Sequence, residues 1–379
     1  MDSNSHSNIL VIDDSKLNRA VIRNTLSGMA MSIHECENGS EGLDMLKSER
    51  FDLILVDTIM PVMDGITFLK EFKQNTGKEF IPTILMTGND DLNSKIKGLN
   101  VGADDFLQKP VNQKELVARV FSLLRLKRTH DQLYEKNELI NKELFAARKI
   151  QQFIIPESFS HVTYPHIFGR YMPMEDIGGD FYDCYTISPD ETGILIADVT
   201  GHGIPAALIV TMTKMIFSIY APKYKSTAGL FSRVNFEIKE MLLENQYITG
   251  FYAIYNKSKG ILRFTNAGHV QPYIYRRSKN KTIALDTNGF FLGILDDANY
   301  EEKGIRIESG DRLILYTDGV TELKNTEKID FGTERLISFI LNKKDVFGES
   351  FCDELISSLH KHCHRDKRND DIAFLNIEF

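Results

Sequence analysis

The first third of the chain alternates short apolar runs with segments of helical periodicity, and this alternation restricts the possible folds most strongly. The apolar runs are Ile9–Ile12, Ile33–Cys36, Leu53–Val56, Thr83–Met86 and Asp105–Leu107. Strands of this length, separated by helix-length segments, predict βα units that wind into one parallel sheet. We therefore expect residues 1–127 to form a doubly wound α/β domain with five strands.

Polar side chains end four of these five runs, namely Asp13, Asp14, Asp57, Thr87 and Lys109. A single aspartate at a strand end is often a helix cap or a turn former. Ligands, however, bind at the carboxyl ends of parallel strands, and carboxylates there suit Mg²⁺. We expect Asp13, Asp14, Asp57 and the Ile59 carbonyl to bind Mg²⁺. Asp57 would be the nucleophile that forms an acyl phosphate, and Lys109 would pair with a phosphoryl oxygen.

The segments VIDDS, DTIMPVMDG, MTGND and GADDFLQKP closely resemble the receiver domains of response regulators, and the resemblance extends from residue 8 to about residue 127. It implies a two-component system in which a cognate histidine kinase donates phosphate to Asp57. It also implies that Thr87 and Phe106 form a switch pair: the hydroxyl moves to the phosphoryl group and the ring turns inward.

The chain has no Gly or Pro from about Leu116 to Ile154, and Pro156 follows, which predicts one long helix. Two rows recur every seven residues in this stretch: Leu126, Leu133, Ile140, Ala147 and Ile154, and Leu123, His130, Asn137, Leu144 and Gln151. This spacing is typical of a coiled coil, in which a buried Asn sets the register. We expect residues 128–156 to be a helical linker that forms a parallel homodimer. The alternative is a lone amphipathic helix packed on either domain.

Residues 157–379 change to strand-like runs with helical windows at Ile204–Tyr220 and Thr227–Glu244, which predicts an α+β domain. Four segments each place an Asp at the end of an apolar run or in a Gly-rich turn, namely GGDFYD (178–183), ADVTGHG (197–203), YTDGVTE (316–322) and RNDDIAF (368–374). Clustered carboxylates select Mg²⁺ or Mn²⁺ over zinc. Two such ions allow direct attack of water on phosphorus, which favours a hydrolase.

These segments, with FTNAGHVQP and GFFLGIL between them, resemble the PPM-type phosphatases from about Ala147 to Phe379. The resemblance is closest to the bacterial branch of sporulation stage II and stress-response phosphatases. It implies an α-β-β-α sandwich, protein serine/threonine phosphatase activity and two bound Mn²⁺ or Mg²⁺ ions. Asp198 would bridge both ions with help from the Val199 carbonyl, Asp318 and Asp370 would hold one, and Asp180 would bind the other or its waters.

Four further residues are candidates for binding the substrate phosphate, for proton transfer or for a structural role. Glu175 lies in the region where eukaryotic relatives carry a phosphate-binding Arg, and Arg170 is a weak substitute candidate. His202 is either the proton donor to the leaving serine oxygen or a turn residue between two glycines. His269 is expected to be structural.

The combined resemblance implies a response regulator whose phosphorylation controls a phosphatase output. Its substrate would be a phosphorylated anti-sigma-factor antagonist in a partner-switching pathway. One alternative is a catalytically weak, phosphatase-like adaptor that binds a partner protein, although all four aspartates are present. GGDFYD also resembles the signature of cyclic dinucleotide cyclases, but Phe181 stands where that signature is acidic. A zinc site at His360, His362, Cys363 and His364 is disfavoured by the basic residues around it.

Composition excludes several other classes. A formal net charge of −8 disfavours nucleic-acid binding. The four cysteines are scattered, which argues against a disulfide framework. No uninterrupted apolar run approaches a membrane span, and the polar first residues lack the layout of a signal peptide, so we expect a cytoplasmic protein.

Overall fold

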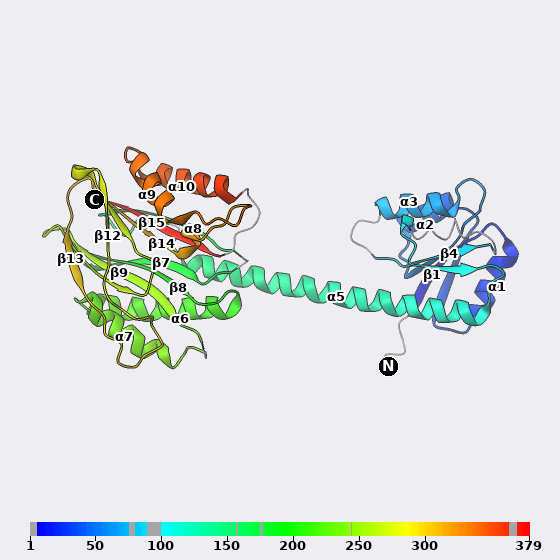
Figure 1. Ribbon diagram of the computed structural model, residues 1–379. Coiled ribbons are helices and arrows are strands. Elements are labelled where there is room, and N and C mark those ends of the chain that lie inside the picture. Colours follow the sequence, from blue (N-terminus) through cyan, green and yellow to red (C-terminus); the bar gives the residue numbers. More distant parts are fainter. Residues whose placement is uncertain are drawn as a thin grey trace. The chain divides into compact units, whose positions relative to one another are not determined.

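A computed structural model describes residues 6–75, 80–88, 100–156, 158–174, 177–243, 245–363 and 370–379. The chain forms two compact units, Met1–Ile140 and Asn141–Phe379, each of which is described by itself (Figure 1).

The first unit contains one parallel sheet in the order β2-β1-β3-β4-β5, which confirms the predicted doubly wound receiver fold. Its strands are β1 (Ser7–Ile12), β2 (Met31–Cys36), β3 (Leu53–Asp57), β4 (Thr83–Thr87) and β5 (Asp105–Gln108). Successive side chains of β1 point to opposite faces of the sheet, because side chains alternate along a strand. They therefore pack in two different hydrophobic cores, one on each face. Ile9 and Val11 pack with α1 (Lys16–Leu26) and the start of α5 (Gln113–Ile154). Leu10 and Ile12 pack with α3 (Gly65–Asn75) and α2 (Gly39–Ser48).

The second unit contains two antiparallel sheets, in the orders β13-β10-β9-β8-β7 and β12-β11-β14-β15-β6. The strands of the first sheet are β7 (Asp180–Ser188), β8 (Glu191–Val199), β9 (Ile248–Asn256), β10 (Ile261–Ala267) and β13 (Lys303–Arg306). Those of the second are β6 (His166–Met172), β11 (Tyr273–Arg276), β12 (Lys281–Ala284), β14 (Arg312–Tyr316) and β15 (Ile372–Glu378).

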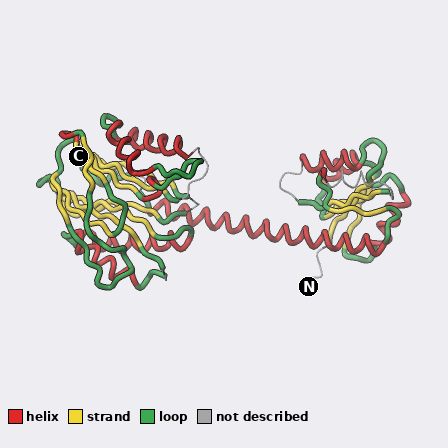
Figure 2. The backbone as a smooth tube through the Cα atoms, in the orientation of Figure 1, coloured by secondary structure: helices red, strands yellow, loops and turns green. Residues whose placement is uncertain are grey.

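Helices cover the outer faces of both sheets, so the predicted α-β-β-α sandwich is confirmed (Figure 2). α6 (Ile204–Tyr220) and α7 (Thr227–Lys239) pack on the first sheet, whereas α9 (Gly332–Asn342) and α10 (Gly348–Cys363) pack on the second. α8 (Asp318–Thr321) and the 3₁₀ turns Ala221–Lys223 and Arg277–Lys279 complete the unit.

α6 has the predicted bounds, whereas α7 ends at Lys239 and is shorter than the predicted window. The chain turns there, because the Met241 amide bonds back to the Ile238 carbonyl before the chain enters β9. Among the described residues, only Ile204–Lys223 is long and apolar enough to span a membrane. Its buried side chains, such as Val210 and Phe217, belong to the core of this unit.

α5 is one continuous helix of 42 residues, as predicted from the absence of Gly and Pro. Leu116, Val120 and Leu124 in its first turns are buried in the core of the first unit. Gln151, near its end, is buried within the second unit. The boundary between the two units therefore falls inside a single helix.

Candidate functional sites

The first candidate site lies at the carboxyl ends of β1 and β3. Oxygen atoms of Asp13, Asp14 and Asp57 all lie within 4.8 Å of one another, close enough to share one cation. Asn18 of α1 donates hydrogen bonds of 3.2 and 3.1 Å to the two Asp13 oxygens and so fixes that carboxylate. Ile59 follows β3 in the adjoining loop, with its side chain exposed.

Lys109 joins two of these carboxylates. Its Nζ lies 2.8 Å from Asp13 Oδ2 and 2.7 Å from Asp57 Oδ2. Burial raises the pKa of Asp57, and the hydrogen bond from Lys109 partly opposes this shift. The hydroxyl of Thr87 is fully buried and has no hydrogen-bond partner in the part of the chain that the structure describes. An unpaired buried donor of this kind is suited to an incoming phosphoryl oxygen.

Phe106 of β5 lies against the long helix. The guanidinium carbon of Arg119, on α5, is 5.4 Å from the centre of the Phe106 ring. Arg119 also pairs with Asp105 at 2.6 Å. The predicted switch ring is therefore in contact with α5 itself.

The second candidate site is built by both sheets of the second unit. The antiparallel register places Asp180 of β7 directly opposite Asp198 of β8. Asp318 begins α8 immediately after β14, and Asp370 lies just before β15, which pairs with β14. The four predicted carboxylates thus come from adjacent strand ends of the two facing sheets.

Thr317 connects the two sheets at this edge. Its hydroxyl donates a 2.6 Å hydrogen bond to Asp180 Oδ2 and accepts one of 3.0 Å from the Ala373 amide. Thr317 itself is fully buried.

Burial and mutual repulsion raise the pKa values of the carboxyl groups at this site. Burial raises the pKa of Asp198 to about 7, with further contributions from Asp318 and Asp370. Burial, and then Asp370, raise the pKa of Asp318 to about 6. For Asp180 the pKa is raised well above its usual value by burial, and then by Asp198. A group of carboxylates offers only oxygen ligands, and its negative charges repel one another. Such a group is suited to binding divalent cations such as Mg²⁺ or Mn²⁺.

These carboxylates are spread more widely than those of the first site. Within the described ranges, only Asp13, Asp14 and Asp57 bring three acidic ligand atoms within 4.8 Å of one another. A wider set is compatible with two ions instead of one.

Asp371 was not predicted as a site residue. It is buried and accepts 2.6 Å hydrogen bonds from the amides of Met174 and Gly179. A Cβ atom on Gly178 would lie 2.1 Å from Asp371 Oδ2, so only glycine fits there. The only sign of Asp371 in the sequence was its place as the second Asp of RNDDIAF. In the structure it accepts a hydrogen bond from Gly179 of the GGD segment.

The remaining predicted residues have different surroundings. The backbone of Val199 pairs with Gly179: its amide donates to the Gly179 carbonyl at 3.1 Å, and its carbonyl faces Gly179. His202 is exposed in the loop before α6. Arg170 is held by Glu349 and by Asp353, the latter at 2.8 Å, on α10. These ion pairs disfavour the candidate role of Arg170 in binding substrate phosphate, and Glu175 lies outside the described residues.

His269 links the two sheets inside the unit. Its Nδ1 lies 2.7 Å from Thr249 Oγ1 and its Nε2 lies 3.0 Å from the Tyr316 carbonyl. Burial lowers the pKa of His269 to about 4, so the ring is neutral. These contacts agree with the structural role predicted for it.

The disfavoured zinc cluster is only partly described. His362 Nε2 lies 3.0 Å from the Ile329 carbonyl oxygen, and His364 is outside the described residues.

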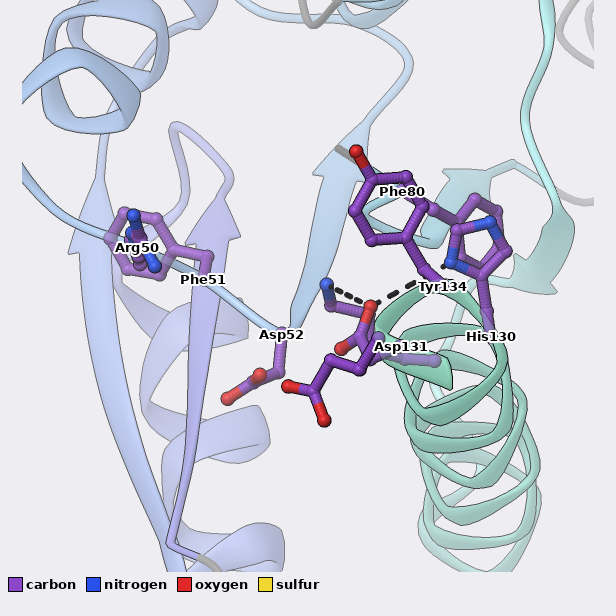
Figure 3. A pocket seen from close by; sticks show the side chains of 9 residues that line it. Arg50, Phe51, Asp52, Phe80, His130, Asp131 and Tyr134 are labelled. Carbon is purple, nitrogen blue, oxygen red and sulfur yellow. Dashed lines mark hydrogen bonds and ion pairs between the residues drawn. The ribbon is translucent and has the colours of Figure 1, made fainter. Parts of the chain in front are cut away.

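α5 uses several heptad positions for contacts within the chain, which corrects the predicted seam. Leu123 is buried in the core of the first unit, and Gln151 is buried in the second. Figure 3 shows the pocket beside α5, which is lined by Phe80 and His130. The centres of these two rings are 4.8 Å apart. His130 therefore also contacts the first unit.

Two family models match the chain. The response regulator receiver domain matches residues 9–121, and Stage II sporulation protein E (SpoIIE) matches residues 188–379, more than half of the chain. The chain belongs to the SpoIIE family. It combines a receiver domain with a SpoIIE-type phosphatase domain of the PPM class, as the sequence motifs predicted.

Two curated relatives each match one of the two domains. The phosphoserine phosphatase RsbU of Bacillus subtilis is 29% identical over 195 residues, covering 52% of this chain and 58% of RsbU. The response regulator MprA of Mycobacterium avium is 37% identical over 123 residues, covering 32% of this chain and 53% of MprA. The chain thus spans little more than half the length of these curated relatives.

A solved structure supports the fold of the SpoIIE-type domain. The SiaA-PP2C domain of Pseudomonas aeruginosa superposes with a TM-score of 0.58 at 20% identity, covering 64% of this chain and 98% of that domain. At this level of identity the likeness concerns the fold alone.

Proposed function

We propose that this protein is a response regulator whose output is a metal-dependent protein serine/threonine phosphatase. The observation that carries the proposal is the meeting of Asp180, Asp198, Asp318 and Asp370 at one edge of the two facing sheets, in a SpoIIE-type domain. The proposed domains are a receiver at residues 1–127, a helical linker at 128–156 and the phosphatase at 157–379.

In the receiver, Asp57 is the proposed phosphate acceptor. One of its carboxylate oxygens would attack the phosphorus of a phosphohistidine, so that an O–P bond forms as the N–P bond breaks. Lys109, whose Nζ lies 2.7 Å from Asp57 Oδ2, would pair with a phosphoryl oxygen. The unpaired hydroxyl of Thr87 would then donate to another oxygen of the same group.

In the phosphatase, the proposed cation ligands are the four aspartates and the Val199 carbonyl. Asp198 would be shared by two Mn²⁺ or Mg²⁺ ions, Asp318 and Asp370 would hold one, and Asp180 the other. In the receiver, Asp13, Asp14, Asp57 and the Ile59 carbonyl would hold one Mg²⁺. Bound divalent ions supply positive charge that offsets the charge on the phosphate oxygens. His202 is the proposed proton donor to the leaving serine or threonine oxygen.

The proposed substrate is a phosphorylated anti-sigma-factor antagonist in a partner-switching pathway, and a histidine kinase is the proposed phosphodonor. The likeness to the phosphoserine phosphatase RsbU supports a phosphoprotein substrate. All four cysteines are free of disulfides, which is in keeping with a reducing cytoplasm.

The proposed assembly is a parallel homodimer through α5. Leu133 and Ile140, one heptad apart, are 59% and 50% exposed. Asn137, between them, is also exposed. Because Leu123 and Gln151 are buried against the chain's own domains, the proposed seam uses the exposed positions Leu126, Leu133 and Ile140 and extends to about Ala147.

The test is hydrolysis of p-nitrophenyl phosphate by the full-length protein with Mn²⁺. Asp198→Asn and Asp318→Asn should each reduce turnover by at least about a hundredfold, because each removes a ligand that the transition state needs. Circular dichroism would confirm that both variants are folded. Undiminished turnover in either folded variant would contradict the proposal, and no turnover in the parent would favour a phosphatase-like adaptor.

A further inference from the structure

Gln151, at the end of α5, binds both backbone groups of a single glycine. Its Nε2 donates a 2.6 Å hydrogen bond to the Gly178 carbonyl, and its Oε1 accepts one of 3.2 Å from the Gly178 amide. Gln151 is 95% buried, with only 5% of its surface exposed. Its neighbour Gln152 is exposed. One side chain of α5 therefore forms hydrogen bonds with both the N–H group and the carbonyl group of Gly178, two residues before Asp180.

The glycine that Gln151 binds is closely surrounded by side chains of the second unit. A Cβ atom on Gly178 would lie 2.1 Å from Asp371 Oδ2 and 2.4 Å from the Tyr171 hydroxyl. The next residue, Gly179, donates to Asp371 at 2.6 Å and accepts from the Val199 amide at 3.1 Å. The backbone that leads into Asp180 is thus held by Gln151 on one side and by Asp371 and Val199 on the other.

A second contact fixes the same end of α5. Lys214 of α6 donates a hydrogen bond to the Ile154 carbonyl, at the C-terminus of α5. A cation is favourable at a helix C-terminus. Lys214 also lies 3.1 Å from Asp183 Oδ2 on β7. α5 is therefore connected to both ends of the segment 178–183. Gln151 of α5 binds Gly178, and Lys214 of α6 links the Ile154 carbonyl of α5 to Asp183.

We propose that Gln151 is a positioning residue that couples the last turn of α5 to the cation site of the phosphatase. By fixing Gly178, it sets the backbone from which the Asp180 carboxylate and the Val199 carbonyl are presented. The inference rests on the proposed function, which assigns these two residues as cation ligands. Groups that orient metal ligands in this way commonly change metal affinity by about 10- to 100-fold when they are removed.

The coupling must act in both directions. If the position of the α5 end changes cation affinity, then cation binding must stabilise the position of the α5 end by the same factor. α5 is continuous with the receiver core, so displacement of its last turn would reach the cation site through these two attachments. The coupling therefore gives the receiver a physical route to the phosphatase that needs no contact between the two domains.

The first experiment measures Mn²⁺ binding by calorimetry in full-length protein carrying Asp13→Ala, which removes the receiver cation site. Gln151→Met keeps the length of the side chain but loses both hydrogen bonds. We expect its dissociation constant for Mn²⁺ to rise about 10-fold or more. Gln152→Met, the matched control at the exposed neighbour, should leave Mn²⁺ binding unchanged. Equal affinity in folded Gln151→Met and in Gln152→Met would overturn the proposal.

The second experiment needs no change at Gln151 and therefore does not depend on the folding of that variant. Hydrogen exchange of the Asp13→Ala protein is followed with and without Mn²⁺. We expect Mn²⁺ to slow exchange of the Gly178 amide and of the amides at the end of α5. Unchanged exchange at these amides, with Mn²⁺ bound, would overturn the coupling. Absence of Mn²⁺ binding by the Asp13→Ala protein would overturn the proposed function instead.

Discussion

The hydroxyl of Thr317 donates a 2.6 Å hydrogen bond to Asp180, and this contact joins the two sheets of the phosphatase unit at the carboxylate edge. Thr317 belongs to the segment that follows β14, whereas Asp180 begins β7 of the other sheet. The Ala373 amide, on β15, binds the same hydroxyl at 3.0 Å. One buried oxygen therefore forms hydrogen bonds to both sheets at the edge where the proposed cation ligands meet.

Thr317→Val should weaken Mn²⁺ binding at this site by about 10- to 100-fold, because Asp180 loses the group that orients it. It should also destabilise the unit by about 1–3 kcal/mol, since the Ala373 amide is left buried without a partner. Calorimetry and thermal unfolding measure the two effects. Thr317→Ser, which keeps the hydroxyl, is the control and should retain most of the affinity. Wild-type affinity in Thr317→Val would show that this contact has no influence on the cation site.

The pKa values of Asp198 and Asp318 predict how pH affects the metal-free protein. Burial and neighbouring carboxylates raise these pKa values from 3.8 to about 7 and about 6, so the folded protein keeps protons that the unfolded chain has lost. The stability of the metal-free phosphatase unit should therefore fall as the pH rises from about 4 to about 7.

Cation binding must displace these protons at low pH. In the Asp13→Ala background, Mn²⁺ should raise the melting temperature more at pH 8 than at pH 5.5. Differential scanning calorimetry measures this difference, and Asp198→Asn should reduce it. An equal increase in melting temperature at both pH values in the parent would show that these carboxylates do not bind the ion.

Asp57 should be the only residue that is labelled by a small phosphodonor such as acetyl phosphate. Lys109 Nζ lies 2.7 Å from Asp57 Oδ2, and Thr87 ends β4, which pairs with the strand that Asp57 ends. Mass spectrometry should find one phosphate in the parent and none in Asp57→Asn. Asp44→Asn, an exposed aspartate on α2, is the control and should be labelled normally. Phosphate that persists in Asp57→Asn would place the acceptor elsewhere.

The exposed apolar row of α5 should mediate a dimer. Leu133→Glu combined with Ile140→Glu should produce monomers, because two charges would lie in the seam. Asn137→Leu should tighten the dimer by replacing a buried polar group. Leu139→Glu is the matched control, since Leu139 is 58% exposed but lies off both heptad rows. Light scattering at tens of micromolar measures the assembly, and a monomeric parent protein would refute the dimer.

The sequence predicted those parts of the protein that depend on local patterns. Strand ends located the Asp13, Asp57 and Lys109 cluster, because carboxyl ends of parallel strands meet at one edge. The Gly- and Pro-free stretch predicted α5 to within a few residues of its observed bounds. Such features follow from periodicity and backbone chemistry, which a sequence displays directly.

Contacts between distant segments could not be predicted in this way. Gln151 occupies a heptad position, so its spacing indicated a helix partner, whereas tertiary packing turns it toward Gly178. His130 shares that heptad row and instead contacts Phe80, whose position depends on the folded sheet. Asp371 stands beside a predicted ligand in the sequence, but its partners Met174 and Gly179 are almost two hundred positions away.

The dependence of hydrolysis on the state of Asp57 is measured most directly by the rate of p-nitrophenyl phosphate turnover with and without beryllofluoride, in full-length protein with saturating Mn²⁺. Beryllofluoride mimics the phosphoryl group on Asp57, and allosteric coupling of about 1–3 kcal/mol corresponds to about 5- to 150-fold. We expect the rate to rise by at least about fivefold in the parent and to stay constant in Asp57→Asn. Equal rates with and without beryllofluoride in the parent, or the same increase in Asp57→Asn, would show that the receiver does not control the phosphatase.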